Sequence, residues 1–221
     1  QILELWQETV RRSEYHDFED EVRYISGLAR DGLQQRSLAQ RFEQKIQRGD
    51  WQEASKLCND LDKVSLLAPE LRAENNLRRA RVENSIDHFS RARMFCERAI
   101  RDLQETGSHP NLLGECYLLL SQVYWKLGNT AESALHLEDA GRNFTKANNP
   151  IGELRVQYER SYMYFRTRQF ALADGLLSDV QRGFREAHEW VHLASTLNLM
   201  GRLARAYLPE GKTIFKAYQD A

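Results

Sequence analysis

The stretch at 112–149 constrains the fold most, because it holds two helical patterns separated by Gly128 and Asn129. Glycine at a helix end supplies a left-handed conformation that other residues avoid, and Asn or Thr after it can begin the next helix. The stretch is therefore predicted to form a helix hairpin. Its apolar residues at helical spacing are Leu113, Cys116, Tyr117, Leu120 and Tyr124, then Ala134, Leu137, Ala140 and Phe144.

The turn region of this hairpin recurs along the chain at intervals of 38 to 41 residues. Each copy has a bulky residue just after the turn, replaced by Thr in one copy, and a small residue three places later. These pairs are Trp51/Ala54, Phe89/Ala92, Thr130/Ser133 and Phe170/Ala173. A small residue also recurs late in each preceding helix, at Ala80, Ser121, Ser161 and Gly201. A fixed period of this length predicts hairpins that stack to bury a shared core.

The repeats resemble the tetratricopeptide (TPR) family over roughly residues 35–207. Its Gly-Asp/Asn-aromatic-x-x-Ala turn is close to GDWQEA at 49–54, and its small-residue-then-Tyr pairing is found at Ser121…Tyr124 and Ser161…Tyr164. The resemblance implies an all-α fold, a right-handed superhelical array (α-solenoid) of antiparallel helix hairpins. The family's usual period is about 34 residues, which this chain exceeds.

Longer repeats of this kind resemble those in the arrays of bacterial signal-transduction ATPases and LuxR-like transcription activators. The resemblance rests on the period and on linker sequences between hairpins such as KANNPIGE. The Pro that ends the family's repeat is displaced, and we expect its counterparts at Pro69, Pro110 and Pro150, with Pro69 closing the first repeat. We expect an N-terminal helical pair at 1–33, either a degenerate repeat or a cap. A TPR-like array of about four and a half repeats follows at 34–208, and a C-terminal helix at 209–221.

Composition excludes several functional classes. The formal net charge of −1 does not favour direct contact with nucleic acid, and no apolar run is long enough to span a membrane. The three cysteines fall on helix faces expected to pack inward, which favours a cytoplasmic protein. No signal-peptide pattern opens the chain. It begins with Gln and ends without a clear polar cap, so we expect it to be a piece of a longer protein.

The first helix of each hairpin is expected to line a concave groove, as the family resemblance implies. The side chains opposite the packing stripe are rich in aromatic, amide and basic groups, which often carry binding energy. We expect them to bind a protein or peptide, with a preference for an acidic or carboxylate-bearing ligand with apolar anchors. The alternative is that they are solvated or pack between repeats. The predicted groove residues are Arg81, Asn84, Gln122, Trp125, Lys126, Arg155, Tyr158, Tyr162, Phe165, Arg166, Asn198, Arg202 and Arg205.

One motif carries a catalytic alternative. His188-Glu189-Trp190-Val191-His192 fits H-E-x-x-H, a zinc-protease pattern in which two His share a helix face, with Glu210 downstream as a third ligand. Here the motif falls at a junction between hairpins, whereas the chemistry requires a supported helix in a cleft. We therefore expect no catalytic residue, metal or cofactor.

Two hypotheses of function follow from these patterns. The first is a non-catalytic protein-interaction or sensor domain in a larger regulatory protein, where occupancy of the groove biases an attached domain. The alternative is a scaffold in a stable multisubunit assembly, which would bury apolar patches on the convex face or the ends of the array. In either case an array end can support self-association.

Overall fold

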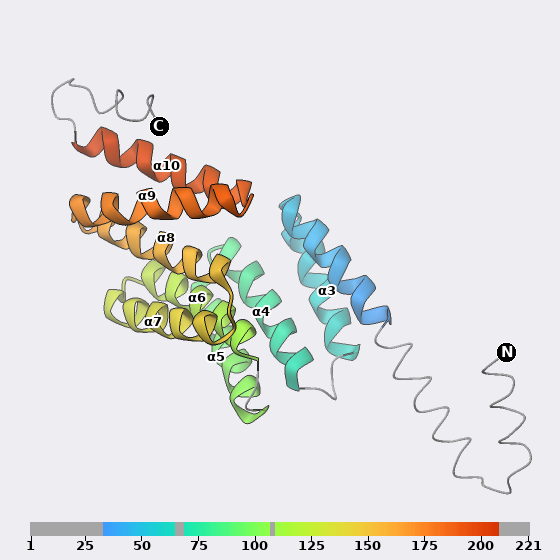
Figure 1. Ribbon diagram of the computed structural model, residues 1–221. Coiled ribbons are helices and arrows are strands. Elements are labelled where there is room, and N and C mark those ends of the chain that lie inside the picture. Colours follow the sequence, from blue (N-terminus) through green and yellow to red (C-terminus); the bar gives the residue numbers. More distant parts are fainter. Residues whose placement is uncertain (1–32, 65–68, 107–108, 208–221) are drawn as a thin grey trace, which may run out of the picture. The chain divides into compact units, whose positions relative to one another are not determined.

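The computed structural model describes residues 33–64, 69–106 and 109–207, and every element within them is a helix (Figure 1). The predicted helical pair at 1–33 and helix at 209–221 lie almost wholly outside these residues. The elements are a helix at 33–47, α3 (Trp51–Val64), α4 (Pro69–Ser85), α5 (Phe89–Thr106), α6 (Pro110–Lys126), α7 (Thr130–Lys146), α8 (Pro150–Arg166), α9 (Phe170–Glu186) and α10 (Trp190–Tyr207).

The period of the sequence is the length of two helices with their turns. Helices α6 to α9 each have 17 residues, and a three-residue connection follows each, so that α6 to α10 start 20 residues apart. Each of these helices contacts the next, as Figure 1 shows. The predicted array of antiparallel hairpins is confirmed.

The connections share one backbone geometry. In each, the second residue has a positive φ: Gly128 (82°), Asn148 (51°), Arg168 (61°) and His188 (57°). Between α7 and α8, the N–H of Asn148 donates to Thr145 O at 3.1 Å and the N–H of Asn149 donates to Phe144 O at 3.0 Å. This pair of bonds closes the end of a helix on a left-handed residue.

In two of these connections the third residue is an Asn that caps the start of the following helix. The Asn129 side chain accepts a hydrogen bond from the N–H of Glu132 at 3.2 Å, and the Asn149 side chain accepts one from Gly152 at 2.9 Å. An amide oxygen at this position satisfies a backbone donor that the first helical turn leaves unpaired. The predicted break at Gly128-Asn129 is therefore confirmed.

Three prolines that were expected to correspond to the Pro at the end of a TPR repeat lie instead at the start of a helix. Pro69, Pro110 and Pro150 are the first residues of α4, α6 and α8, so they begin hairpins and do not close repeats. Proline suits this position because its fixed φ is helical and its missing N–H has no partner in the first turn. The expectation that Pro69 closes the first repeat was wrong.

The chain divides into two compact units, with the division inside α4 between Asn75 and Asn76. In the first unit, the helix at 33–47 and α3 bury Phe42, Ala54 and Leu61. The buried Asn75 side chain donates to Cys58 O at 3.0 Å, which ties the start of α4 to α3. The second unit holds the end of α4 and α5 to α10.

Three of the four small residues that recur late in the first helices, Ala80, Ser121 and Ser161, are buried, whereas Gly201 of α10 is exposed. The Ser121 hydroxyl donates to Ser133 O and the Ser133 hydroxyl donates to Ser121 O, both at 2.8 Å, so α6 and α7 pack closely there. At the equivalent crossings, Ala80, Ala92 and Ala173 are all fully buried.

A second close crossing surrounds Phe144 of α7, which is fully buried with Leu118, Leu137, Ala140 and Val156. A Cβ atom on Gly114 would lie 2.7 Å from the Phe144 ring, and one on Gly152 would also overlap that ring. Glycine on both α6 and α8 thus allows both helices to approach the Phe144 ring closely.

The cysteines behave as predicted from their spacing. Cys58, Cys96 and Cys116 are buried, and each is a free thiol. Burial raises the pKa of the Cys116 thiol to about 12, so it stays protonated and unreactive at neutral pH. Their role is packing in the core.

Candidate functional site

A cavity of about 590 Å³ lies between the first helices of successive hairpins in the second unit. We call it the α6–α8 groove, since most of its lining comes from those two helices, with single residues from α4, α5 and α7. The lining residues are Asn84, Phe89, Ser121, Gln122, Trp125, Lys126, Ser133, Tyr158, Glu159, Tyr162, Met163 and Arg166.

Aromatic side chains form one wall of the groove. The Trp125 ring of α6 meets the Tyr162 ring of α8 edge-on, with centroids 6.3 Å apart. Tyr158 and Tyr162 also pack against the core cluster of α9 and α10, which contains Leu177 and Leu203. This backing fixes the rings, which lowers the entropy that a bound partner would cost.

Two exposed cations stand at the rim of the groove. Lys126 Nζ lies 4.9 Å from the centroid of Phe89 and donates to Asn84 Oδ1 at 3.2 Å. Arg166 donates to the Tyr162 hydroxyl at 3.1 Å and lies over the same ring. Both side chains are therefore held beside the opening by neighbouring groups.

A partly buried carboxylate, Glu159, lies at the floor. Gln122 Nε2 of α6 donates to Glu159 Oε1 of α8 at 2.6 Å, a bond that crosses the groove. Burial raises the pKa of the Glu159 carboxyl above its ordinary value, although the Gln122 bond and the charges of Arg155 and Lys126 oppose this change. The floor is thus acidic while the rim is basic.

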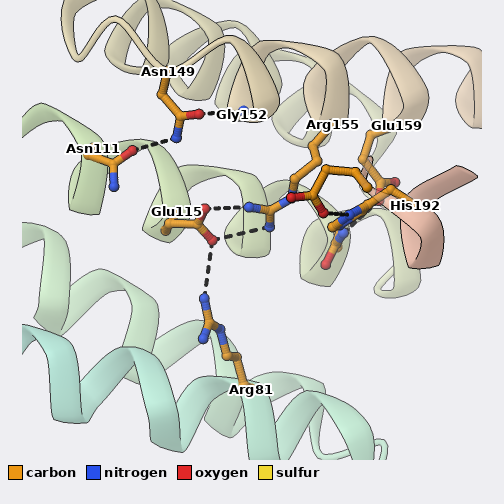
Figure 2. Close-up of polar contacts among 10 residues, drawn as sticks. Arg81, Asn111, Glu115, Asn149, Gly152, Arg155, Glu159 and His192 are labelled. Carbon is orange, nitrogen blue, oxygen red and sulfur yellow. Dashed lines mark hydrogen bonds and ion pairs between the residues drawn. The ribbon is translucent and has the colours of Figure 1, made fainter. Parts of the chain in front are cut away.

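An ion-pair triad joins three successive first helices. Arg81 of α4 and Arg155 of α8 approach the carboxylate of Glu115 on α6 from two sides (Figure 2). Arg81 Nη2 lies 3.1 Å from Glu115 Oε2, and Arg155 uses both terminal nitrogens. Glu115 is only 16% exposed, so water screens these charges less than on an open surface.

The structure brings just over half of the predicted groove residues to one cavity. Those that line it are Asn84, Gln122, Trp125, Lys126, Tyr158, Tyr162 and Arg166. Arg81 and Arg155 belong instead to the triad with Glu115. Arg202 lies over the Tyr162 and Phe165 rings, 5.9 and 4.9 Å from their centroids.

The other predicted residues have different surroundings. Phe165 packs against Phe170 of α9 within its own hairpin, with ring centroids 6.0 Å apart. It also packs against the core cluster that includes Leu203 of α10, so the alternative of packing between repeats holds for this ring. Asn198 and Arg205 are exposed on α10, and neither lines the groove.

The sequence prediction missed Glu159. It lies four residues after Arg155 and three before Tyr162, so helical spacing places it on the same face as those predicted residues.

The H-E-x-x-H motif does not lie on one helix. His188 is in the turn between α9 and α10 with a left-handed backbone, and α10 begins at Trp190. His192 instead stacks on the Phe184 ring at 5.1 Å and is bonded to Glu189. In the described residues, no group of three or more His, Cys, Asp or Glu is arranged to hold a metal ion; Glu210, the third ligand considered, lies outside them.

No helix in the described part of the chain combines the length and apolar character needed to cross a bilayer.

Comparison with known proteins shows the fold. No family model matches the chain, and no curated protein matches it in sequence. The crystal structure of BtubC (BKLC) from P. vanneervenii is similar, with a TM-score of 0.57 and 13% identity, covering 87% of this chain and 94% of that one.

A kinesin-light-chain-like protein with nearly identical TPR-like repeats, from Podosopora anserina, is also similar. Its TM-score is 0.54 at 18% identity, and the match covers 80% of this chain and 98% of that one. The chain thus has a TPR-like α-solenoid fold. At these identities, the likeness concerns the fold alone.

Proposed function

We propose that this chain is a non-catalytic protein-interaction domain that binds a peptide segment of a partner in the α6–α8 groove. The observation that carries the proposal is the groove itself, about 590 Å³ and lined by side chains of five helices. Its wall of Trp125 and two tyrosines can anchor apolar groups, and the Gln122 and Asn84 amides can bond a peptide backbone.

The rim suggests a chemical preference in the partner. Lys126 and Arg166 are exposed on either side of the opening, one on α6 and one on α8. Both positive charges would attract acidic residues of a bound peptide, which would stabilise the complex and speed the association of the peptide. We therefore propose that the partner segment carries acidic residues next to the part that enters the groove.

We further propose a regulatory role, because the groove is lined mainly by two successive hairpins. A peptide that contacts both α6 and α8 favours the arrangement of successive hairpins in which both contacts form. We propose this role on the sequence-based expectation that the long repeat period is similar to that of bacterial signal-transduction ATPases and LuxR-like activators. In such a protein the shift would reach an attached domain. The buried, free thiols suit a reducing cytoplasm.

The test uses a random 12-residue peptide phage library selected on the 221-residue chain. Affinities of the selected peptides are then measured by fluorescence anisotropy on the wild type, on Trp125→Ala and on Trp190→Ala. Trp190 is the matched control, because it is 60% exposed on α10 and does not line the groove.

We expect Trp125→Ala to weaken binding at least about tenfold and Trp190→Ala to leave it unchanged, with both variants folded by circular dichroism. If selected peptides bind all three proteins with the same affinity, the groove is not the binding site. If no peptide is enriched, the proposed function fails.

One observation favours the scaffold alternative as a second candidate. Helix α10 exposes Trp190, Val191 and Leu197, with exposed fractions of 60%, 78% and 46%. Large exposed apolar side chains on one helix are typical of a surface that packs against another subunit. A scaffold role predicts that Leu197→Glu changes the mass measured by light scattering, whereas a monomeric peptide-binding domain keeps the same mass.

A further inference from the structure

The carboxylate on the floor of the groove is paired with an amide and not with a cation. Glu159 accepts a hydrogen bond from Gln122, and among the described residues no Lys or Arg forms an ion pair with it. The charges of Arg155 and Lys126 lower the pKa of Glu159, but Arg155 is bound to Glu115 and Lys126 donates to Asn84. A carboxylate removed from water without a direct ion pair is unfavourable, so a bound cation would be stabilised there.

The aromatic wall offers a second feature suited to a cation. Nearby rings already have cations of this chain over them: Lys126 over Phe89, and Arg166 and Arg202 over Tyr162. Within the described part of the chain, no Lys or Arg lies over the Trp125 ring. Indole attracts cations more strongly than the other aromatic side chains.

We propose that the α6–α8 groove receives an Arg or Lys side chain of the partner peptide, which pairs with Glu159 and lies against the Trp125 ring. This inference rests on the proposed function and names the chemistry of its ligand. Trp125 and Glu159 line the same cavity, one from α6 and one from α8, so a single extended side chain can reach both.

The rim cations determine what must surround this basic residue. Lys126 is held by Asn84 and Arg166 by the Tyr162 hydroxyl, both beside the opening and not at the floor. They would repel a peptide that is basic throughout. The occupant is therefore a peptide with one basic residue between acidic ones, whose basic side chain reaches the floor and whose acidic side chains stay at the rim.

The experiment uses synthetic 12-residue peptide libraries with one fixed central residue and random flanks. The fixed residue is Arg, Lys, citrulline or Glu; citrulline has nearly the shape of Arg and no charge. Each library is bound to the 221-residue wild type, to Glu159→Gln and to Glu138→Gln. The last variant removes the same charge from the exposed face of α7, outside the groove.

The wild type should enrich the Arg and Lys libraries over the citrulline and Glu libraries. For a selected Arg peptide, replacement of Arg by citrulline should raise Kd about tenfold or more. Glu159→Gln should bind the Arg and citrulline forms equally, while Glu138→Gln should behave like the wild type. Glutamine keeps an oxygen that can accept from Gln122, so Glu159→Gln should remain folded, as circular dichroism would check.

The outcomes separate the two claims. If peptides bind and lose affinity in Trp125→Ala, but show no preference for Arg or Lys or bind Glu159→Gln as tightly as the wild type, the basic anchor is wrong and the groove stands. Enrichment of the Glu library also overturns the basic anchor. If no library binds above a scrambled control, the proposed function fails together with this inference.

Discussion

At the scale of single residues, two glycines decide how closely α6 and α8 approach the ring of Phe144. Gly114 and Gly152 leave no room for a Cβ, and Phe144 is fully buried, so its ring cannot move aside into solvent. The repeat pattern alone predicts that Phe144 is in the core. It does not show that glycines on two other helices contact the ring.

We predict that Gly114→Ala or Gly152→Ala lowers the free energy of unfolding by about 1–3 kcal/mol, because the new methyl group overpacks the ring. Gly175→Ala on α9 is the control, since a Cβ there meets nothing within 4 Å. Alanine has the higher helix propensity, so the control should be stabilised by up to about 1 kcal/mol. Urea unfolding measures the unfolding free energy of the three variants. A Gly114→Ala variant as stable as the wild type would contradict overpacking of the Phe144 ring.

Glu159 gives a prediction of pH dependence. Because burial raises the pKa of its carboxyl, the folded chain binds this proton more tightly than the unfolded chain does. The resulting stability is present at low pH and is lost as the pH rises from the ordinary pKa of 4.5 through the raised one.

We therefore expect Glu159→Gln to gain stability relative to the wild type as the pH rises through that window, since glutamine cannot ionise. Urea unfolding of both proteins from about pH 4 to pH 7 measures the difference. A difference that is constant with pH, or one that falls as the pH rises, would show that burial does not raise this pKa.

At the scale of the elements, the hydrogen bonds between Ser121 and Ser133 distinguish one helix crossing from its equivalents. Ser161 is at the position in α8 that corresponds to Ser121 in α6, but its hydroxyl donates to Gln157 O within its own helix. The sequence predicts small residues at both places. It does not predict which hydroxyl bonds to the neighbouring helix.

We expect Ser121→Ala to cost about 1 kcal/mol of unfolding free energy, because it removes a buried bond between α6 and α7. Ser161→Ala should cost little or be stabilising, because its bond competes with the backbone of the same helix. Thermal and urea unfolding compare the two, and a Ser161→Ala loss as large as that of Ser121→Ala would contradict this distinction.

The turns show where sequence patterns succeed and where they do not. Gly128 predicts a left-handed residue from the sequence, whereas Arg168 and His188 adopt the same conformation although neither is glycine. His188 matches a metal motif in sequence, but its left-handed backbone places it in the turn before helix α10. The 20-residue register of the turns identifies it as a connection.

At the scale of the whole chain, the repeat period predicted the all-α hairpin array, and the structural neighbours confirm the TPR-like fold. Helical spacing also predicted seven of the residues that line the α6–α8 groove. The polarity of its floor was not predicted, because the bond between Gln122 and Glu159 joins residues 37 positions apart. Contacts of this kind depend on how successive hairpins stack.

Site-specific photocrosslinking of a selected peptide tests directly whether the peptide binds in the α6–α8 groove. The photoreactive residue p-benzoylphenylalanine replaces Arg166 at the rim of the groove or, as a control, Arg182, which is exposed on α9 and does not line the groove. Mass spectrometry then measures the crosslinked fraction. Binding in the α6–α8 groove predicts a crosslink from position 166 and none from position 182. Equal crosslinking from both positions, or a crosslink from 182 alone, would contradict binding in the α6–α8 groove.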